Sequence, residues 1–313
     1  MSPTPGEARI EAVVCIPTFR RPQQLAKTLA SLMGQIGDVK FAVVVVENDA
    51  PRCDGKEVAD GVFAGGKLPG LCVVETNQGN CFAINRAFAT GLERYPQAEY
   101  LLMIDDDEVA APSWLAEMVR AARQNGADIV GGPVLRHFDG PADRSQQLHP
   151  LFNSPAHASG FLPSLYGSGN CLIARHVFEA LDEPEFDLRF NFLGGGDMDF
   201  FSRCRQRGFK TYWNSHAVAV ESVPVQRLAM HWMVRRALTT GVINYTIDRK
   251  RHPDALGYAG LWIKNLLSLP LSLVRAARLF ARTGHWLPAS FPVLVALGRS
   301  MGALGFAPAP YKA

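Results

Sequence analysis

The sequence predicts an α/β fold, a mostly parallel sheet flanked by helices, followed by a C-terminal helical extension. In the first half, short apolar runs typical of strands buried on both faces alternate with segments of helical spacing. Such alternation requires crossovers, and therefore parallel strand pairing. Residues 225–313 instead carry 12 Lys/Arg against two Asp/Glu, whereas residues 1–224 carry 20 against 27. We therefore expect one domain over residues 1–224 and a basic, apolar extension over residues 225–313.

Four buried strands are expected in order, over residues 12–17, 41–46, 71–75 and 100–104. Helical spacing follows the first strand through residues 25–33 and the third through residues 84–92. Beyond residue 128 the pattern is mixed. It predicts strands at 129–133, 167–174 and 212–220, a loop or lid at 137–165, and a helix from 197 to about 207.

Polar residues end all four early strands, as Thr18/Arg20, Glu47/Asn48, Asn77/Asn80 and Asp105/Asp107. Ligands of open α/β sheets bind outside the carboxyl ends of the strands, so these residues are expected to form a binding site. The glycine fingerprint for dinucleotides and the phosphate-loop lysine motif do not follow the first strand. A nucleotide would be held in another way.

The triplet Asp105-Asp106-Asp107 closes the fourth strand. Alternate residues point the same way, so Asp105 and Asp107 are expected to converge while Asp106 points elsewhere. Adjacent carboxylates repel one another unless a cation lies among them, and oxygen ligands suit Mg²⁺ or Mn²⁺. The alternative is a solvated acidic turn without a ligand.

A second cluster, residues 194–199, reads Gly-Gly-Gly-Asp-Met-Asp before a helix. A carboxylate at a helix start is stabilised as the anion, which suits Asp197 or Asp199 as a general base or as an acceptor for a sugar hydroxyl. Simple capping of the helix is the alternative. His216, His231 and Glu221 are candidates for a third metal ligand, and Trp213 and Trp232 for sugar stacking or core packing.

Five segments in order make the chain resemble the family 2 glycosyltransferases of the GT-A fold, and most of all the bacterial members that build exopolysaccharides such as succinoglycan. The segments are Ile-Pro-Thr-Phe-Arg-Arg (16–21), Val-Glu-Asn-Asp (46–49), Asn-x-Gly-x5-Asn-Arg (77–86), the Asp triplet, and Gly-Gly-Asp-x-Asp-Phe-Phe (195–201). The resemblance covers residues 12 to about 222.

The resemblance implies a metal-dependent, inverting transfer of a sugar from a nucleotide-diphosphate donor, a UDP-sugar, to a hydroxyl of a lipid-linked or polysaccharide acceptor. Asp105 and Asp107 match the family's Asp-x-Asp motif, with Mn²⁺ or Mg²⁺ as the cofactor. Asp197 stands at the position of the catalytic base, with Asp199 beside it. The donor-binding residues implied by the match are Pro17, Thr18, Phe19, Arg20, Glu47, Asn48, Asn77, Gly79, Asn85, Asp105 and Asp106.

Two positions depart from the family pattern. Gly196 replaces a Glu that often precedes the base, and the usual His-Glu-Pro segment reads Val220-Glu221-Ser222. The histidine's place at the metal would then stay empty or pass to His216. The rival functions are a nucleotide-sugar hydrolase, a nucleotidyltransferase, or a non-catalytic sugar-binding protein on the same fold.

The extension holds apolar stretches at 257–280 and 283–298, with flanking Arg/Lys and with Pro270, Pro288 and Pro292. Such helices suit the interface of an anionic membrane, and the alternative is packing on the first domain or in an oligomer. No nucleic-acid-binding motif accompanies the charge. Residues 1–11 lack a signal-peptide pattern and the six cysteines show no metal spacing, so a cytoplasmic protein, peripheral on the cytoplasmic face of the inner membrane, is expected.

Overall fold

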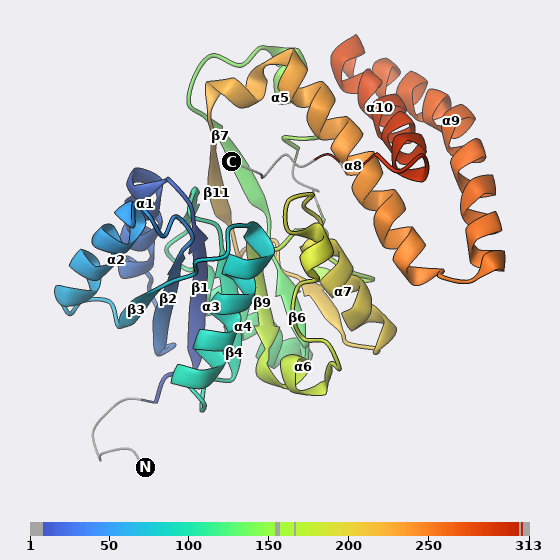
Figure 1. Ribbon diagram of the computed structural model, residues 1–313. Coiled ribbons are helices and arrows are strands. Elements are labelled where there is room, and N and C mark those ends of the chain that lie inside the picture. Colours follow the sequence, from blue (N-terminus) through green and yellow to red (C-terminus); the bar gives the residue numbers. More distant parts are fainter. Residues whose placement is uncertain (1–8, 154–156, 166, 307, 309–313) are drawn as a thin grey trace. The chain divides into compact units, whose positions relative to one another are not determined.

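The computed structural model describes residues 9–153, 157–165, 167–306 and 308. The described chain forms two compact units (Figure 1). The N-terminal unit is drawn from Met1–Leu135, Pro155–Asn191 and Gly196–Glu221, and the C-terminal unit from Arg136–Ser154, Phe192–Gly195 and Ser222–Ala313. The C-terminal unit therefore takes in two short segments that lie before residue 225, where we expected the extension to begin.

An eight-stranded sheet in the order β3-β2-β1-β4-β9-β6-β10-β8 is the centre of the N-terminal unit. β1–β2, β1–β4, β2–β3 and β6–β10 pair parallel, whereas β9 runs antiparallel to β4 and β6, and β8 antiparallel to β10. This confirms the mostly parallel sheet. The strands are β1 (Ala12–Thr18), β2 (Phe41–Glu47), β3 (Gly70–Val74), β4 (Tyr100–Ile104), β6 (Ile129–Gly131), β8 (Gly160–Leu162), β9 (Asn170–Ala174) and β10 (Thr211–Trp213).

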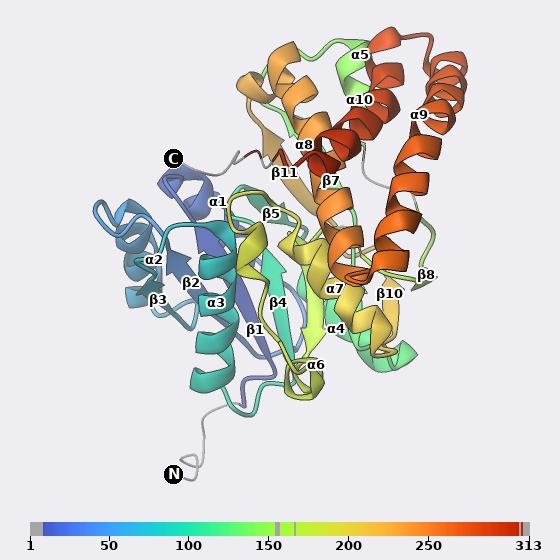
Figure 2. The same ribbon diagram turned by 45° about the vertical axis from the view of Figure 1, so that its right-hand side comes forward.

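A smaller sheet has the order β5-β11-β7 (Figure 2). Its strands are β5 (Glu108–Ala110), β7 (Val134–Phe138) and β11 (Ala219–Val223). β11 pairs antiparallel with β5 and sets Glu221 opposite Glu108. The chain passes between the two units along β7 and β11, since the division falls inside both strands.

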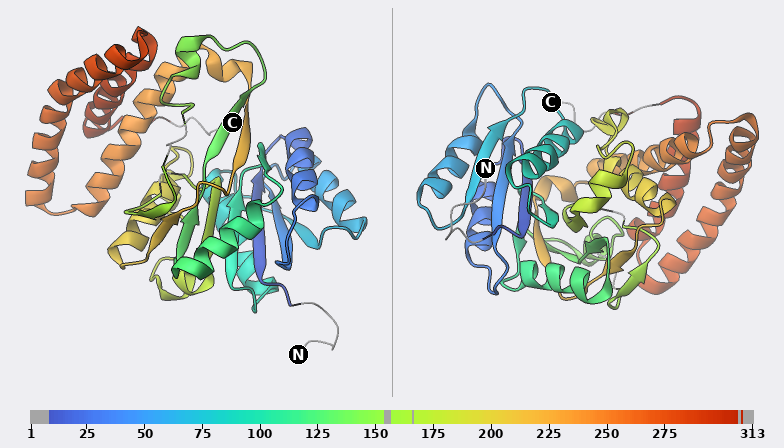
Figure 3. Two further views of the ribbon diagram at one scale, coloured as in Figure 1. Left: turned by 180° about the vertical axis from the view of Figure 1, so that it is seen from behind. Right: turned by 90° about the horizontal axis from the view of Figure 1, so that it is seen from below.

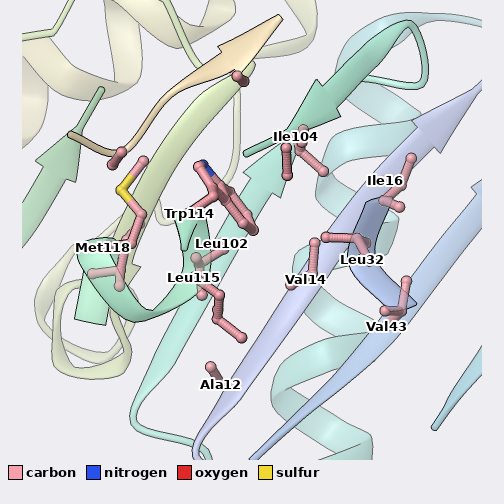
Figure 4. Close-up of a cluster of buried hydrophobic side chains, with 14 of the residues drawn as sticks. Ala12, Val14, Ile16, Leu32, Val43, Leu102, Ile104, Trp114, Leu115 and Met118 are labelled. Carbon is pink, nitrogen blue, oxygen red and sulfur yellow. The ribbon is translucent and has the colours of Figure 1, made fainter. Parts of the chain in front are cut away.

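Helices cover both faces of the large sheet. On one face, alternate residues of β1 and β2 pack with Leu32 and with Trp114, Leu115 and Met118 (Figure 4). These come from α1 (Pro22–Met33) and α4 (Trp114–Asn125), and α2 (Asp54–Ala64) adds Ala59. β1 is buried along its whole length, which explains its unbroken apolar sequence.

The opposite face carries α3 (Asn80–Arg94), α6 (Arg175–Ala180) and α7 (Gly196–Gln206). Figure 1 shows α3 in front of the sheet, and the view from behind in Figure 3 shows α4 there. Four phenylalanines, Phe88, Phe178, Phe186 and Phe200, join these elements, with ring centroids 5.0 Å to 6.1 Å apart. The short helix η1 (Leu188–Phe190) precedes the turn into α7.

The C-terminal unit is helical. It contains α5 (Arg144–Gln147), η2 (Val225–Leu228), α8 (Met230–Arg251), α9 (Ala255–Thr283) and α10 (Trp286–Ala303). The last three helices together form the helical extension expected from the sequence. Among the described residues, no helix combines the length and the apolar character that crossing a membrane requires.

Three features were not predicted. α2, α4 and α6 lie where no helix was expected, and residues 137–165, expected as a loop, contain the end of β7 together with α5 and β8. The stretch 212–220, expected as one strand, belongs to β10 and β11 in different sheets. All six cysteines are free thiols.

Candidate active site

Hydrogen bonds link the polar ends of the first four parallel strands in the order of the sheet. The Asn48 side chain after β2 donates to the backbone oxygens of Glu75 and Asn77 after β3, at 3.0 Å and 2.8 Å. The Arg20 Nε after β1 donates to Asp49 Oδ2 at 2.7 Å. Thr18 Oγ1, at the end of β1, donates to Asp106 Oδ2 after β4 at 2.8 Å. The strand ends therefore converge, as the sequence predicted.

The three aspartates after β4 have different surroundings. Asp106 is buried and accepts from Thr18 and from Arg21 Nη1, the latter at 2.9 Å. The same Arg21 nitrogen donates to Asp107 Oδ2 at 2.8 Å. Asp106 thus turns toward β1, where it shares Arg21 with Asp107 although the two were expected to point apart, and Arg21 neutralises part of the negative charge. Arg21 was not among the predicted site residues, although it lies in the Ile-Pro-Thr-Phe-Arg-Arg segment.

Asp105 lies against the loop before β9. A Cβ on Gly169 would lie 2.8 Å from Asp105 Oδ2 and 2.7 Å from Glu108 Oε1, so the glycine backbone approaches both carboxylates. The Asp105 backbone N–H donates to Glu108 Oε2 at 3.2 Å. Glu108 is buried, and neither it nor Gly169 was a predicted site residue.

The pKa of Asp105 is raised to about 7. Burial is the main cause, followed by the negative charges of Asp107 and Asp106, while Arg21 opposes the shift and Asp197 adds to it. The pKa of Asp106 is raised by burial as well, against the lowering effect of Arg21. A carboxylate held in this way gains from a cation placed beside it.

Asp197 stands in the first turn of α7, half-buried, and its Oδ1 accepts from the Met198 backbone N–H at 2.8 Å. Its negative charge adds to the raised pKa of Asp105, so α7 and the end of β4 bring the two predicted clusters within electrostatic range of each other. Gly194 and Gly195 precede the helix with φ of +85° and +89°, values that glycine adopts without strain. The helix start favours the anionic form of a carboxylate in its first turn.

Packing explains why glycine stands at position 196. A Cβ on Gly196 would lie 2.9 Å from Cys81 Sγ and 3.2 Å from Phe186, so the glutamate that often stands here has no room. The departure from the family pattern therefore follows from how α7 packs on α3.

Asp199 has a structural role. It is 3% exposed, and its Oδ2 accepts from Arg203 Nε at 2.9 Å. Arg203 also donates to the backbone oxygens of Glu183 and Glu185, so the pair fastens α7 to the preceding segment. We expected Asp199 in the catalytic set, and the structure places it buried and paired with Arg203.

Glu47 and Asn48 shape the site from behind. Glu47 is 1% exposed, and its two oxygens accept from the backbone N–H groups of Asp49 and Gly55 at 2.8 Å and 2.7 Å, which ties β2 to the start of α2. The Asn48 Oδ1 accepts from the Gly79 backbone N–H at 2.7 Å, and its Nδ2 donates to the backbone oxygens of Glu75 and Asn77. Both were expected to contact a nucleoside, and the structure instead uses their polar atoms within the protein.

Other expected donor-binding residues have internal partners as well. Pro17 is buried within β1 opposite Val46. The Asn85 side chain bonds the Phe186 backbone in both directions, at 2.9 Å and 2.7 Å. A Cβ on Gly79, whose φ is +134°, would collide with the Asn191 side chain at 2.0 Å. Asn191, another residue missed from sequence, accepts from Cys81 N at the start of α3.

Three of the expected donor-binding side chains reach solvent at the rim. The Arg20 guanidinium lies 4.7 Å from the centre of the half-buried Phe19 ring and is about half-exposed. Asn77 is exposed, and its Nδ2 donates to Glu75 Oε1 at 2.9 Å. Phe19, Arg20 and Asn77 are thus the expected residues that remain available to a ligand beside the acidic cluster.

His216 does not join the aspartates. It is exposed, its backbone N–H donates to Asn214 Oδ1 at 3.1 Å, and its charge acts on Glu117 of α4. Glu221 lies closer to the acidic cluster, because the β5–β11 register sets it beside Glu108 on the same side of the strand pair. Trp213 is buried, with an edge-to-face contact to His157, which favours core packing.

A family model described as "Glycosyl transferase family 2" matches residues 13–181, more than half of the chain. The chain belongs to glycosyl transferase family 2. This family 2 enzyme is 29% identical over 237 residues to the succinoglycan biosynthesis protein ExoM of Rhizobium meliloti (strain 1021), a match that covers 74% of this chain and 72% of that protein.

Solved structures share the fold. The mannosyltransferase PcManGT of Pyrobaculum calidifontis, in complex with GDP-Man and Mn²⁺, has a TM-score of 0.62 at 18% identity and covers 96% of this chain and 89% of its own. Residues 1–349 of S. aureus TarS, in complex with UDP, have a TM-score of 0.53 at 13% identity and cover 95% and 92%. The likeness confirms the GT-A fold expected for this glycosyltransferase.

The donor set suits a metal that arrives with a diphosphate. Within the described ranges, no three His, Cys, Asp or Glu side chains are placed to hold a metal ion by themselves. Mg²⁺ and ions like it are often held by one or two carboxylates together with waters and substrate phosphates. Asp105 and Asp107 can supply two carboxylates, and the raised pKa of Asp105 shows that the site favours added positive charge.

Proposed function

We propose that this glycosyltransferase moves a sugar, with inversion, from a UDP-sugar to a hydroxyl of a lipid-linked or polysaccharide acceptor in exopolysaccharide synthesis. The observation that carries the proposal is that Asp105 at the end of β4 and Asp197 at the start of α7, two separate elements, lie within electrostatic range of each other. The role in exopolysaccharide synthesis is supported by the likeness to the succinoglycan biosynthesis protein. UDP and GDP-Man bound to the two solved structures support a nucleotide-linked donor.

In this mechanism, Asp197 accepts the proton of the acceptor hydroxyl as its oxygen attacks the anomeric carbon. The new carbon–oxygen bond forms on the face opposite the bond to the diphosphate, which breaks and releases the nucleoside diphosphate with its electron pair. Asp197 stands in the first turn of α7, where the helix dipole favours negative charge.

Asp105 and Asp107 would hold a Mn²⁺ or Mg²⁺ ion, which as a Lewis acid supplies positive charge to the leaving diphosphate. Arg21, paired with Asp107, keeps that carboxylate in position. Phe19 and Arg20 offer an aromatic face and a cation at the rim, where a base and phosphates would lie. Glu47, Asn48 and Asn85 hold the loops in shape behind them.

We place the acceptor at a lipid surface on the cytoplasmic face of the inner membrane. Residues 225–313, with 12 basic residues against two acidic ones, support binding to anionic lipid. The acidic residues of the site lie in the N-terminal unit, where basic and acidic residues are more nearly balanced.

Turnover with a panel of UDP- and GDP-sugars, in Mn²⁺, in Mg²⁺ and with chelator, tests the proposal. We expect that one UDP-sugar is consumed, and that its consumption requires a divalent ion. Transfer from a GDP-sugar would show that the donor is not a UDP-sugar. Full turnover in the presence of chelator would show that the reaction needs no metal ion. Release of a nucleoside monophosphate, or synthesis of the nucleotide-sugar itself, would favour the hydrolase or nucleotidyltransferase alternative. Donor binding without turnover of any sugar would favour a binding protein.

A further inference from the structure

Helix α9 is built with its apolar side outward. Its buried positions are Leu261, Asn265 and Ser272, two of which are polar. Helices of soluble proteins show the opposite arrangement, with the apolar stripe buried. The exposed large apolar residues of α9 are Leu256, Tyr258, Trp262, Ile263, Leu266, Leu267, Leu271, Leu273, Val274 and Phe280.

Polar contacts hold the inner side of α9 within the C-terminal unit. Lys264 Nζ of α9 and Arg299 Nη2 of α10 lie 2.7 Å and 2.8 Å from Asp248 Oδ2 of α8. Arg299 Nε donates to Asn265 Oδ1 at 3.1 Å. Three helices are thus joined by charged and amide groups at the buried side of α9, while most of its large apolar side chains are exposed.

Small residues bring α8 and α10 close together. A Cβ on Gly241 would lie 2.1 Å from the Val295 backbone oxygen, and one on Gly298 would lie 2.0 Å from that of Leu238. Small and polar residues between helices, with large apolar side chains outside, are typical of helices that face lipid. Figure 2 shows α9 along the outer side of this helical unit, against α10.

Basic residues border the apolar face. Arg275, Arg278 and Arg282 are exposed at spacings of three and four residues, so they lie on one side of α9. At 3.6 residues per turn, that row runs along the edge of the outward face and away from the buried positions. Residues 255–313 contain no Asp or Glu, so nothing acidic in this segment offsets these charges.

We propose that α9 lies in the plane of an anionic lipid surface. Its outward apolar face enters the boundary between headgroups and acyl chains, and its arginine row binds the headgroups. An in-plane position fits a helix with a strong apolar face and a basic edge, because such helices bury one face in the interface without crossing the bilayer. The inference goes beyond sugar transfer, since lipid binding by α9 does not depend on which reaction the N-terminal unit performs.

Flotation of the full chain with vesicles tests it. Vesicles of phosphatidylcholine with phosphatidylglycerol are compared with phosphatidylcholine alone. We expect the wild type to float with the anionic vesicles, and Leu266→Gln/Leu267→Gln to lower the bound-to-free ratio by about tenfold or more. Arg278→Gln/Arg282→Gln should remove most of the preference for anionic lipid. The matched control is Ile36→Gln, an equally exposed apolar residue on the N-terminal unit, which should bind as wild type does.

Circular dichroism of each variant confirms that it is folded. Quenching of tryptophan fluorescence by brominated lipid, compared between wild type and Trp262→Phe, checks insertion of α9. Wild type that stays with the buffer, or a Leu266→Gln/Leu267→Gln protein that floats as well as wild type, overturns the proposal. A wild-type dimer in light scattering that this variant converts to a monomer, with no effect on flotation, assigns the face to a second copy of the chain instead. None of these readings involves sugar transfer, so the catalytic proposal stands or fails separately.

Discussion

At the residue scale, the carboxylates of the site are distinguished by their partners. Asp106 is held by Thr18 and Arg21, Asp199 by Arg203, and Asp105 faces the Gly169 backbone with a raised pKa. The sequence could place the aspartates, because the apolar strand before them and the helix after the glycines are local patterns. It could not separate Asp197 from Asp199, because the ion pair of Asp199 is visible only in the folded structure.

The raised pKa of Asp105 predicts how the stability of the metal-free protein depends on pH. Since folding raises this pKa from 3.8 to about 7, the metal-free folded protein binds an additional proton between these values, and its stability falls as the pH rises through that range. Asp105→Asn should therefore raise the melting temperature above pH 7, with the difference vanishing near pH 4. Melting curves of both proteins without metal measure this, with the exposed Asp38→Asn as the control. A gain that is the same at every pH would contradict the assignment.

A second prediction concerns Gly169, whose backbone lies against two carboxylates of the site. Its absent side chain leaves room for Asp105 Oδ2 and Glu108 Oε1, so Gly169→Ala should push these carboxylates aside, cost about 1–3 kcal/mol of stability, and weaken binding of UDP with Mn²⁺ by about tenfold or more. Calorimetry measures the affinity. Gly167→Ala, in the same loop with open space around the new methyl group, is the control. Equal affinities for the two variants would mean that the Gly169 backbone does not position the site.

At the scale of elements, the end of β2 and the start of α2 form one structural joint. Glu47→Gln keeps one acceptor oxygen and sets an amide against the backbone N–H of Asp49 or Gly55, so it should cost about 1–3 kcal/mol of unfolding free energy. Affinity for UDP with Mn²⁺ in the folded variant should stay within about twofold, as for the exposed Glu57→Gln on the same helix. Urea unfolding and calorimetry test this. If Glu47→Gln instead loses affinity for UDP while its unfolding free energy is unchanged, Glu47 contacts the nucleotide.

The elements that sequence predicted well are those buried by their own pattern. Each of the four early strands is an apolar run, and each appears within a residue or two of its expected ends. The segment 137–165 was misjudged because β7 and β8 exist through pairing with β11 and β10, which lie far along the chain. The register that sets Glu221, one of the candidates for a third metal ligand, beside Glu108 is likewise a tertiary property that local sequence patterns do not show.

At the scale of the whole molecule, the charge arithmetic and the two-unit division agree on a basic helical region late in the chain. The sequence alone indicated that this region is apolar and basic. It could not show that α9 buries Asn265 and Ser272 and exposes its leucines, because that choice depends on how α8 and α10 pack. The family match extends over residues 13–181, so α9 and its outward face lie beyond it.

The central claim is that Asp197 is the base of sugar transfer at a donor site built on Asp105. The most direct test compares turnover and donor affinity of Asp197→Asn with wild type, using the donor selected by the panel. The account predicts turnover lower by roughly 10²–10⁴-fold and affinity for the nucleoside diphosphate with Mn²⁺ within about twofold of wild type. Near-wild-type turnover in Asp197→Asn, or the large loss appearing in a folded Asp199→Asn instead, would contradict it.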